Sequence, residues 1–330
     1  MKLRTLSGLL LTLSLGATLA ACSGGEATET SADGKTKLTV GIIGIGSDAA
    51  ITTAIDRGYF AEEGLEVETT VVANPPAGIA AAQSGQLDLS YTPSIPLINA
   101  LSQNIDLKVV AAADGYGEEG AADDPSQVDD TALFVQPGSS ITRAKDLEGK
   151  KVAVPARKAQ IEVTVANMVL QDGGDPATIN WMVLDPASSL QSLEQGRVDA
   201  AGLVAPFSTN AQKQGMELLG NPGLEFFESG AVGLWVAGGS TVAKEPEVMD
   251  GFARAIYKAN AYANENLDEM DEVAAQITGI DLDTIRLGAE NYWPLSVELE
   301  DLQRVDSRLV ELGYLTEEVK LDDSLILDTK

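Results

Sequence analysis

The stretch QSGQLDLSY, residues 83–91, is echoed by EQGRVDAAG at residues 194–202. Both stretches contain a glycine followed three positions later by an aspartate, Gly85 and Asp88 in the first and Gly196 and Asp199 in the second, and each residue lies 111 positions from its counterpart. The same spacing relates VVANP at 71–75 to MVLDP at 182–186. A constant spacing across separate landmarks is typical of a duplicated unit, so the sequence predicts two halves that are built alike.

Each half reads as strands that alternate with helices. The duplicated glycine is expected to end a helix in the left-handed conformation. The duplicated aspartate is expected to accept hydrogen bonds from nearby backbone donors, which is a structural role. The first half has strands at 37–43, 64–73, 87–91 and 107–113, a helix capped by Ser47 that stops at Gly58, and helices at 77–83 and 96–103. The second half has strands at 150–155, 179–185 and 198–204 and helices at 160–170 and 188–196. Such alternation favours parallel sheets with helical crossovers.

Two extended apolar segments, at 129–137 and 230–239, separate the halves from each other and from three helical stretches at 246–264, 270–277 and 297–312. The sequence therefore predicts an α/β fold of two lobes, each a mostly parallel sheet flanked by helices, joined by two crossover strands. Residues 37–131 and 236–330 are expected to form lobe 1, and residues 132–235 lobe 2. The hinge is expected at 132–135 and 234–237.

The N-terminus reads as a targeting segment. Two cations precede a short apolar run and small residues, which is typical of a signal peptide at residues 1–21. The single cysteine of the chain follows in the order Leu19-Ala20-Ala21-Cys22, which resembles the bacterial lipoprotein box, in which the cysteine is lipidated. Residues 22–36 then read as a flexible linker. A soluble secreted protein with an unmodified cysteine is the alternative.

Charge and composition exclude several functions. The chain has 22 basic and 50 acidic residues and a net charge of −28, which argues against nucleic-acid binding. It has no histidine, so a Ser-His-Asp triad and histidine metal ligands are ruled out. We expect no enzyme, no catalytic residue, no metal and no cofactor. The acidic run from Glu118 to Asp130 lacks the spacing of a calcium loop and reads as a solvated loop.

A ligand site is expected at the carboxyl ends of the strands, where the helix N-termini of the two lobes face each other. Arg157 and Lys158 precede a helix, where cations oppose the helix dipole, so a bound anion would explain them; exposure to solvent is the alternative. Phe207, Tyr91 and Tyr116 either wall the pocket or belong to the core. The expected ligand-binding residues are Ser47, Asp48, Pro76, Tyr91, Thr92, Ser94, Tyr116, Arg157, Lys158, Gln160 and Phe207.

Five stretches together resemble a known family: AIDRGYFAEEGLEVE (54–68), QSGQLDLSY (83–91), DLEGKKVAVP (146–155), SLEQGRVDA (192–200) and LVELGYL (309–315). They are similar to the nitrate/sulfonate/taurine-type substrate-binding proteins of ABC importers, a family that also contains thiamine-precursor and riboflavin binders. The resemblance implies a two-lobed periplasmic-binding-protein type II fold.

The same resemblance implies a protein that captures a small solute between its lobes, and Arg157 and Lys158 make an anion such as a sulfonate, nitrate or carboxylate the expected solute. We expect a monomer, anchored outside the cytoplasm by lipidated Cys22 as the lipoprotein box implies. Its partners would be an ABC permease and an ATPase subunit, and its membrane contact would be the anchor alone. Three alternatives stay open: a ligand-sensing lipoprotein that reports to a receptor, a binder of a heterocyclic vitamin precursor such as a pyrimidine or flavin, and a structural surface lipoprotein without a pocket.

Overall fold

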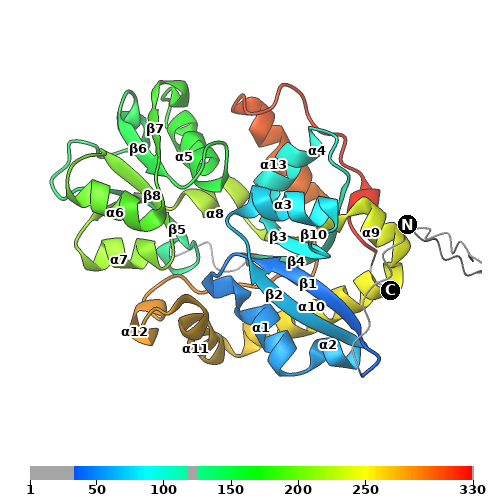
Figure 1. Cartoon of the computed structure of the whole chain (residues 1–330). Coiled ribbons are helices and arrows are strands. Elements are labelled where there is room, and N and C mark those ends of the chain that lie inside the picture. The colour runs from blue at the N-terminus through cyan, green and yellow to red at the C-terminus, as the bar shows by residue number, and fades with distance from the viewer. Residues whose placement is uncertain (1–32, 118–124, 329–330) are drawn as a thin grey trace, which may run out of the picture.

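The computed structural model describes residues 33–117 and 125–328, which form two lobes around two five-stranded sheets (Figure 1). The first sheet contains β1 (Thr36–Ile42), β2 (Leu65–Val71), β3 (Leu89–Pro93), β4 (Leu107–Tyr116) and β10 (Gly230–Gly238). The second contains β5 (Thr131–Val135), β6 (Lys151–Val154), β7 (Asn180–Val183), β8 (Ala200–Val204) and β9 (Glu217–Gly220). The predicted signal peptide, Cys22 and the predicted linker up to residue 32 lie outside the described residues.

The two sheets have the same topology. Their strand orders are β2-β1-β3-β10-β4 and β7-β6-β8-β5-β9. In the first sheet β1 pairs in parallel with β2 and β3, whereas β10 runs antiparallel to β3 and β4. In the second sheet β6 pairs in parallel with β7 and β8, whereas β5 runs antiparallel to β8 and β9. The predicted two-lobed α/β fold, with mostly parallel sheets and two crossover strands, is confirmed.

Helices cover both faces of each sheet. They are α1 (Ala49–Asp56), α2 (Tyr59–Glu62), α3 (Pro75–Ser84), α4 (Ser94–Leu101), α5 (Gln160–Gln171), α6 (Pro186–Glu194), α7 (Phe207–Lys213), α8 (Pro222–Phe227), α9 (Gly239–Lys244), α10 (Pro246–Glu265), α11 (Leu267–Thr278), α12 (Leu282–Ile285) and α13 (Leu299–Glu311). Short 3-10 helices are η1 (Gly46–Asp48), η2 (Pro125–Gln127), η3 (Ala144–Leu147), η4 (Pro176–Thr178) and η5 (Asp323–Leu325). No helix in the described part of the chain is long and apolar enough to span a membrane.

The duplicated landmarks hold equivalent places in the two lobes. Gly85 ends α3 at φ 76° and Gly196 follows α6 at φ 65°, a left-handed conformation that glycine adopts without steric cost. Asp88 accepts a hydrogen bond from a backbone N–H of β1 at 2.7 Å, and Asp199 accepts one from β6 at 2.8 Å. The aspartates therefore join the end of each helix to the neighbouring strand, the structural role that the sequence predicts.

The strand pairing locates the crossings between the lobes. All of β10 pairs with β3 and β4, from residue 230 to residue 238, so the expected boundary at 235/236 falls inside a strand of the first sheet. All of β5 pairs with strands of the second sheet. The chain therefore crosses once between β4 and β5 and once more around α8, which leads from β9 into β10.

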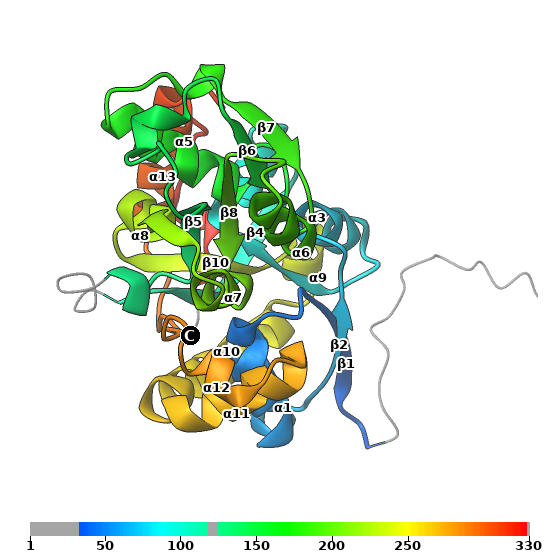
Figure 2. The ribbon, with the colours of Figure 1, turned by 90° about the vertical axis from the view of Figure 1, so that its left-hand side faces the viewer.

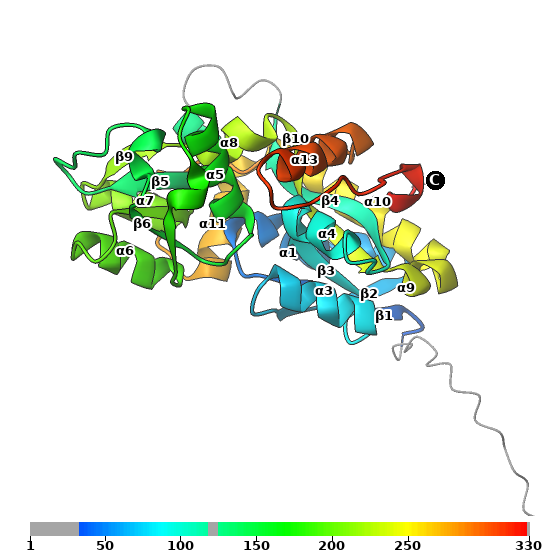
Figure 3. The same cartoon turned by 90° about the horizontal axis from the view of Figure 1, so that it is seen from above.

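The C-terminal helices return to the first lobe, as the sequence predicts. Helix α10 packs against α1 and β4, and α11 packs against α1 and η1. Helix α13 contacts α4 and α8 (Figure 3). Two of these helices also reach the second lobe, because α12 contacts α7 (Figure 2) and α13 contacts α8, which packs against α5 and β5. The C-terminal helices thus border the gap between the lobes on two sides, with α12 near α7 and α13 near α4.

Candidate functional site

A small polar cavity of about 30 Å³ lies where the two lobes meet. The loop after β1 contributes Gly46 and Ser47, the first crossing contributes Asp130, the loop after β8 contributes Pro206, and the C-terminal segment contributes Asn291. One water occupies roughly 10–15 Å³ on this measure, so in this conformation the cavity has room for a few waters. Strand ends of both lobes converge on this cavity, which is where the sequence analysis expects the ligand site.

Ser47 and Tyr91 both donate to one carboxylate, that of Asp114 near the end of β4. The Ser47 hydroxyl lies 2.5 Å from Oδ2 of Asp114 and the Tyr91 hydroxyl lies 3.0 Å from the same atom. Ser47 was expected to cap a helix; the structure corrects this, because its side chain makes no cap bond and reaches across the sheet to Asp114. Burial is the main cause that raises the pKa of Asp114, and burial also raises that of Tyr91.

Asp48 is buried, with 1% of its surface exposed. Its Oδ2 accepts hydrogen bonds from the backbone N–H groups of Gly44 and Ile45, at 2.7 and 3.0 Å. Its Oδ1 has no hydrogen-bond partner. Burial raises the pKa of Asp48 to about 6, and the nearby charge of Asp114 adds to the shift.

Asp129 and Asp130 end the acidic run that the sequence suggests is a solvated loop; that expectation is wrong for Asp129, which is buried, whereas Asp130 is half-buried. Asp129 is 3% exposed. It accepts hydrogen bonds from the Tyr116 hydroxyl at 2.8 Å, from the Thr131 hydroxyl at 2.7 Å and from the backbone N–H of Leu224 at 2.7 Å, and so it ties the two crossings together. Residues 118–124 lie outside the described part of the chain.

Asp130 contributes to the wall of the cavity and has the most perturbed acidity of the group. Burial raises its pKa to about 8, and the charges of Asp129 and Asp114 add to the shift. Its backbone carbonyl accepts hydrogen bonds from the N–H of Ala205 and the hydroxyl of Ser208. Asp130 therefore joins the crossing to the second lobe through its main chain, while its carboxyl group remains among other acidic groups.

Arg157 and Lys158 do not lie at this cavity. The Arg157 guanidinium pairs with Glu162 of α5, whose side chain is 1% exposed. Glu162 also accepts hydrogen bonds from the backbone N–H of Lys158 at 3.0 Å and from the Tyr314 hydroxyl at 3.1 Å. The Lys158 carbonyl accepts a hydrogen bond from Asn99 of α4. The Glu162 carboxylate thus supplies, beside Arg157, the negative charge that the sequence analysis expects from a bound anion.

Comparison with known proteins bears directly on this two-lobed arrangement. Residues 47–270 match the family model described as NMT1/THI5 like. The chain belongs to the NMT1/THI5-like family. A putative aliphatic sulfonates-binding protein of Bacillus subtilis (strain 168) is 22% identical over 284 residues, which are 83% of this chain and 81% of that relative. The resemblance inferred from the sequence is thereby confirmed.

Solved structures share the fold. The periplasmic aliphatic sulphonate binding protein SsuA from Escherichia coli superposes with a TM-score of 0.70 at 19% identity, over 88% of this chain and 97% of that one. The periplasmic nitrate-binding protein NrtA from Synechocystis PCC 6803 superposes with a TM-score of 0.68 at 14% identity, over 85% of this chain and 82% of that one.

The other expected site residues of this family member are scattered. Thr92 is fully buried near the end of β3 and Ser94 at the start of α4, and the Ser94 hydroxyl has no hydrogen-bond partner. Pro76 is exposed at the start of α3 and Gln160 is half-buried at the start of α5. Phe207 packs against the core of the second lobe. The structure thus brings Ser47, Asp48, Tyr91 and Tyr116 close to Asp114, and among the expected residues Ser47 is the one that lines the cavity.

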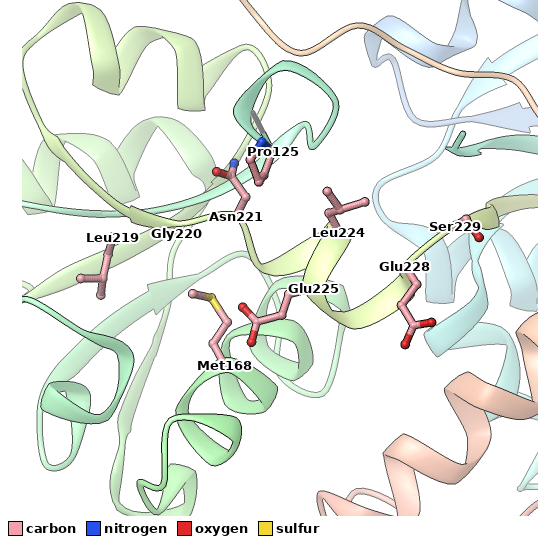
Figure 4. Close-up of a pocket in the computed structure, with 9 residues that line it drawn as sticks. All are labelled: Pro125, Met168, Leu219, Gly220, Asn221, Leu224, Glu225, Glu228 and Ser229. Carbon is pink, nitrogen blue, oxygen red and sulfur yellow. The ribbon is translucent and has the colours of Figure 1, made fainter. Parts of the chain in front are cut away.

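A larger recess of about 760 Å³ lies elsewhere, beside α8 (Figure 4). Met168 of α5 and Glu225 of α8 point into the same space, while Glu228 at its rim pairs with Arg308 of α13. The recess lies at the second crossing beside the end of β9, and none of its lining residues belongs to a strand of the first sheet. Size alone therefore does not identify the site, and the smaller interlobe cavity is the candidate.

Two acidic residues of the site were not among those expected from the sequence. Asp114 directly follows the apolar strand LKVVAAA, and Asp130 directly precedes the apolar segment TALFV. Asp114 and Asp130 could have been predicted as site residues because each is a charged residue at the end of a buried strand, and ligands bind at strand ends. Within the described residues no group of three or more acidic or cysteine side chains is placed to hold a metal ion.

Proposed function

We propose that this chain is the solute-binding component of an ABC importer and that it holds a small molecule between its lobes. The observation that carries the proposal is the duplication: two lobes of identical strand order present strand ends and polar side chains to one shared cavity. Sites between two such lobes are a favoured place for small ligands. The family relatives named for binding aliphatic sulfonates support the same function.

Ligand capture would require the lobes to move, because the present cavity admits little more than water. The expected hinges at 132–135 and 234–237 lie inside β5 and β10, which are paired on both sides. We place the bending instead at the ends of the crossings, next to Asp129 and at residues 228–230. Glu228 and Gly230 there have φ values of 66° and 92°, and hinges are a few residues at element ends that absorb a change in backbone angle.

The remaining assignments rest on the sequence. We propose that residues 1–21 are removed, that Cys22 carries the lipid, and that the two lobes stand outside the cytoplasm as a monomer. We propose that the surface formed when lobe 1 and lobe 2 close docks on the permease. ATP hydrolysis would be carried out by a separate subunit. We propose no catalytic activity. Mass spectrometry of the mature N-terminus tests the anchor, because diacylation adds a mass that plain signal cleavage does not.

A thermal-shift screen tests solute binding directly. The panel would contain nitrate, sulfate, alkanesulfonates, aromatic carboxylates, pyrimidines, flavins and organic amines. A ligand present at about 100 times its Kd adds roughly 2.7 kcal/mol to the free energy of unfolding, which is an easily measured rise in Tm. A hit is followed by calorimetry, and the proposal expects one ligand per chain. A panel without any hit, together with calorimetry that shows no binding, contradicts the proposal.

A further inference from the structure

Helix α7 of the second lobe and α12 of the first meet through a chain of hydrogen bonds. The Lys213 ammonium at the end of α7 donates to the Thr284 hydroxyl at 2.5 Å, and that hydroxyl donates to Oδ2 of Asp281 at 2.5 Å. Oδ1 of Asp281 accepts the backbone N–H of Thr284 at 2.9 Å. The hydrogen bonds from Thr284 are the main cause that lowers the pKa of Asp281, and the charge of Lys213 adds to the shift. A cation of one lobe and a carboxylate of the other thus share one hydroxyl group.

This contact lies beside the interlobe cavity and forms part of its wall. Thr209 of α7 lines the cavity from the second lobe, and Ile285 and Gly288 line it from the first. The two lobes approach each other so closely here that a Cβ atom on Gly288 would lie 3.0 Å from the Thr209 hydroxyl oxygen. This part of the wall therefore exists only while α7 and the segment after α12 are in contact, and their separation opens the cavity on this side.

Apolar side chains hold the lobes together where α4 meets α5. Five side chains from α4, α5 and α8 belong to one core cluster: Ile95, Ile98, Val163, Phe226 and Phe227. None of the five is more than 2% exposed. Separation of α4 from α5 would expose this cluster to water, which is costly, whereas water replaces the hydrogen bonds of the α7–α12 contact at a much smaller net cost. Opening of the lobes is therefore expected to part α7 from α12 and to leave α4 and α5 packed together.

The distribution of charge favours an attraction between Lys213 and the first lobe. Residues 131–228, which contain the second sheet, include 8 basic and 11 acidic residues, so most of the net charge of −28 belongs to the first lobe. Asp281 and Asp283, at the start of α12, are exposed acids of that lobe. Negative charge on both lobes disfavours closure in general, whereas Lys213 places a cation against the acidic surface. Salt screens an attraction of this kind between exposed charges.

We propose that Lys213 is a latch residue, which holds the lobes closed at the α7–α12 contact and so raises the affinity for the solute without touching it. The inference rests on the proposed function and concerns the control of that same site. Lys213 is not among the residues that line the cavity. A contact made only in the closed form increases the fraction of binding-competent molecules, and the apparent Kd falls in proportion. Lys213 is thus a positioning residue, which acts through the placement of α7 against α12.

Distances measured in the free protein test the latch without any solute. Four exposed glutamines can be replaced by cysteine in a Cys22→Ser background and spin-labelled in two pairs, Gln214 with Gln276 across the α7–α12 contact and Gln103 with Gln171 across the α4–α5 side. By pulsed electron resonance, Lys213→Met should lengthen and broaden the 214–276 distances and leave the 103–171 distances unchanged. The difference from the wild type should shrink at high salt, where the attraction is screened.

Two further lysine variants make the distance measurement specific. Lys213→Arg keeps the charge and a donor, so it should restore the wild-type distribution. Lys151→Met is the matched control, because it removes an exposed lysine of the same lobe at the start of β6 and should have no effect. An unchanged 214–276 distribution in folded Lys213→Met, or an equal change in Lys151→Met, overturns the inference.

Affinity measurements separate the latch from solute capture itself. For the compound of the thermal-shift panel that gives the largest shift, Lys213→Met should raise the Kd about 10-fold, as expected for the loss of one hydrogen bond to a charged group. Gly288→Ala, which adds a methyl group against Thr209, should change the Kd in the same direction. An unchanged Kd in Lys213→Met, with the protein folded by circular dichroism, contradicts the latch. A panel without any hit contradicts the proposed function, whereas the distances in the free protein still decide the latch.

Discussion

Replacing Asp130 by asparagine should make the free protein more stable at pH 8 and leave it unchanged at pH 4. Asp130 has a pKa of about 8 in the native state because it is buried beside Asp129 and Asp114, whereas a free aspartate has a pKa of about 3.9. The groups that face it also include Tyr91 and Tyr116. An asparagine resembles the protonated carboxyl and so avoids the cost of ionisation in this cluster.

The magnitude follows from the two pKa values. Between about pH 4 and pH 8 the native state holds a proton that the unfolded state has released, so the free energy of unfolding falls as the pH rises. Each pH unit contributes about 1.4 kcal/mol, and about four units separate the two values. The destabilisation therefore reaches at most about 5 kcal/mol at pH 8, and it vanishes below pH 4, where both states are protonated.

Urea denaturation between pH 4 and pH 8.5 measures the effect. The wild type should lose stability over this range, and Asp130→Asn should lose clearly less. The slope that remains should come from Asp48, whose pKa is about 6, together with Asp114 and Asp129. Asp56→Asn, a change at an exposed residue at the end of α1, should follow the wild type. Equal stability losses in wild type and Asp130→Asn, or a variant that is less stable at pH 8, would show that ionised Asp130 is well solvated or well bonded and would refute the reasoning.

Three further changes have defined outcomes. Trp293→Phe removes the hydrogen bond from the indole to the Ser47 carbonyl and should cost about 1–3 kcal/mol of unfolding free energy; it should also weaken ligand binding, and calorimetry that shows an unchanged Kd would count against a role for the Ser47 loop. Asp88→Ala and Asp199→Ala should each cost about 1–2 kcal/mol in urea titrations, and their costs should add because the residues lie in different lobes; a strong coupling would contradict that independence. Arg157→Ala should lower stability by about 1–3 kcal/mol, since it leaves buried Glu162 without its cation, but should not alter the Kd; loss of binding would restore Arg157 as a ligand residue.

The duplication explains why the fold could be predicted from the sequence. The paired glycines Gly85 and Gly196 end helices, which is a local backbone function, and the paired aspartates Asp88 and Asp199 each bond the backbone of the adjacent strand in their own lobe. The shortest helices and strands were not predicted from the sequence. Strand β9 has four residues and α8 has six, and such segments gain their conformation from tertiary packing rather than from their own periodicity. The lobe boundary was misplaced because GAVGLWVAGG reads equally well as a crossing and as a strand.

The site was less predictable because its electrostatics depend on which side chains the fold brings into contact. Arg157 suggested an anion, but the structure pairs it with Glu162, five positions away on the next helix. Asp130 belonged to an acidic run that suggested solvent exposure, and it is half-buried where the lobes meet. The partner of Ser47 is Asp114, 67 residues along the chain. Composition shows how acidic the protein is, but only the fold shows which acids are buried together.

A distance measurement between the lobes tests most directly whether a solute is held between them. Gln83 of α3 and Glu194 of α6 are exposed and occupy equivalent places in the two lobes, so both can be replaced by cysteine in a Cys22→Ser background and spin-labelled. Addition of the compound that gives the largest thermal shift should shorten and narrow the distance distribution measured by pulsed electron resonance. A compound that binds one per chain by calorimetry, yet leaves that distribution unchanged, would contradict capture by closure of the two lobes.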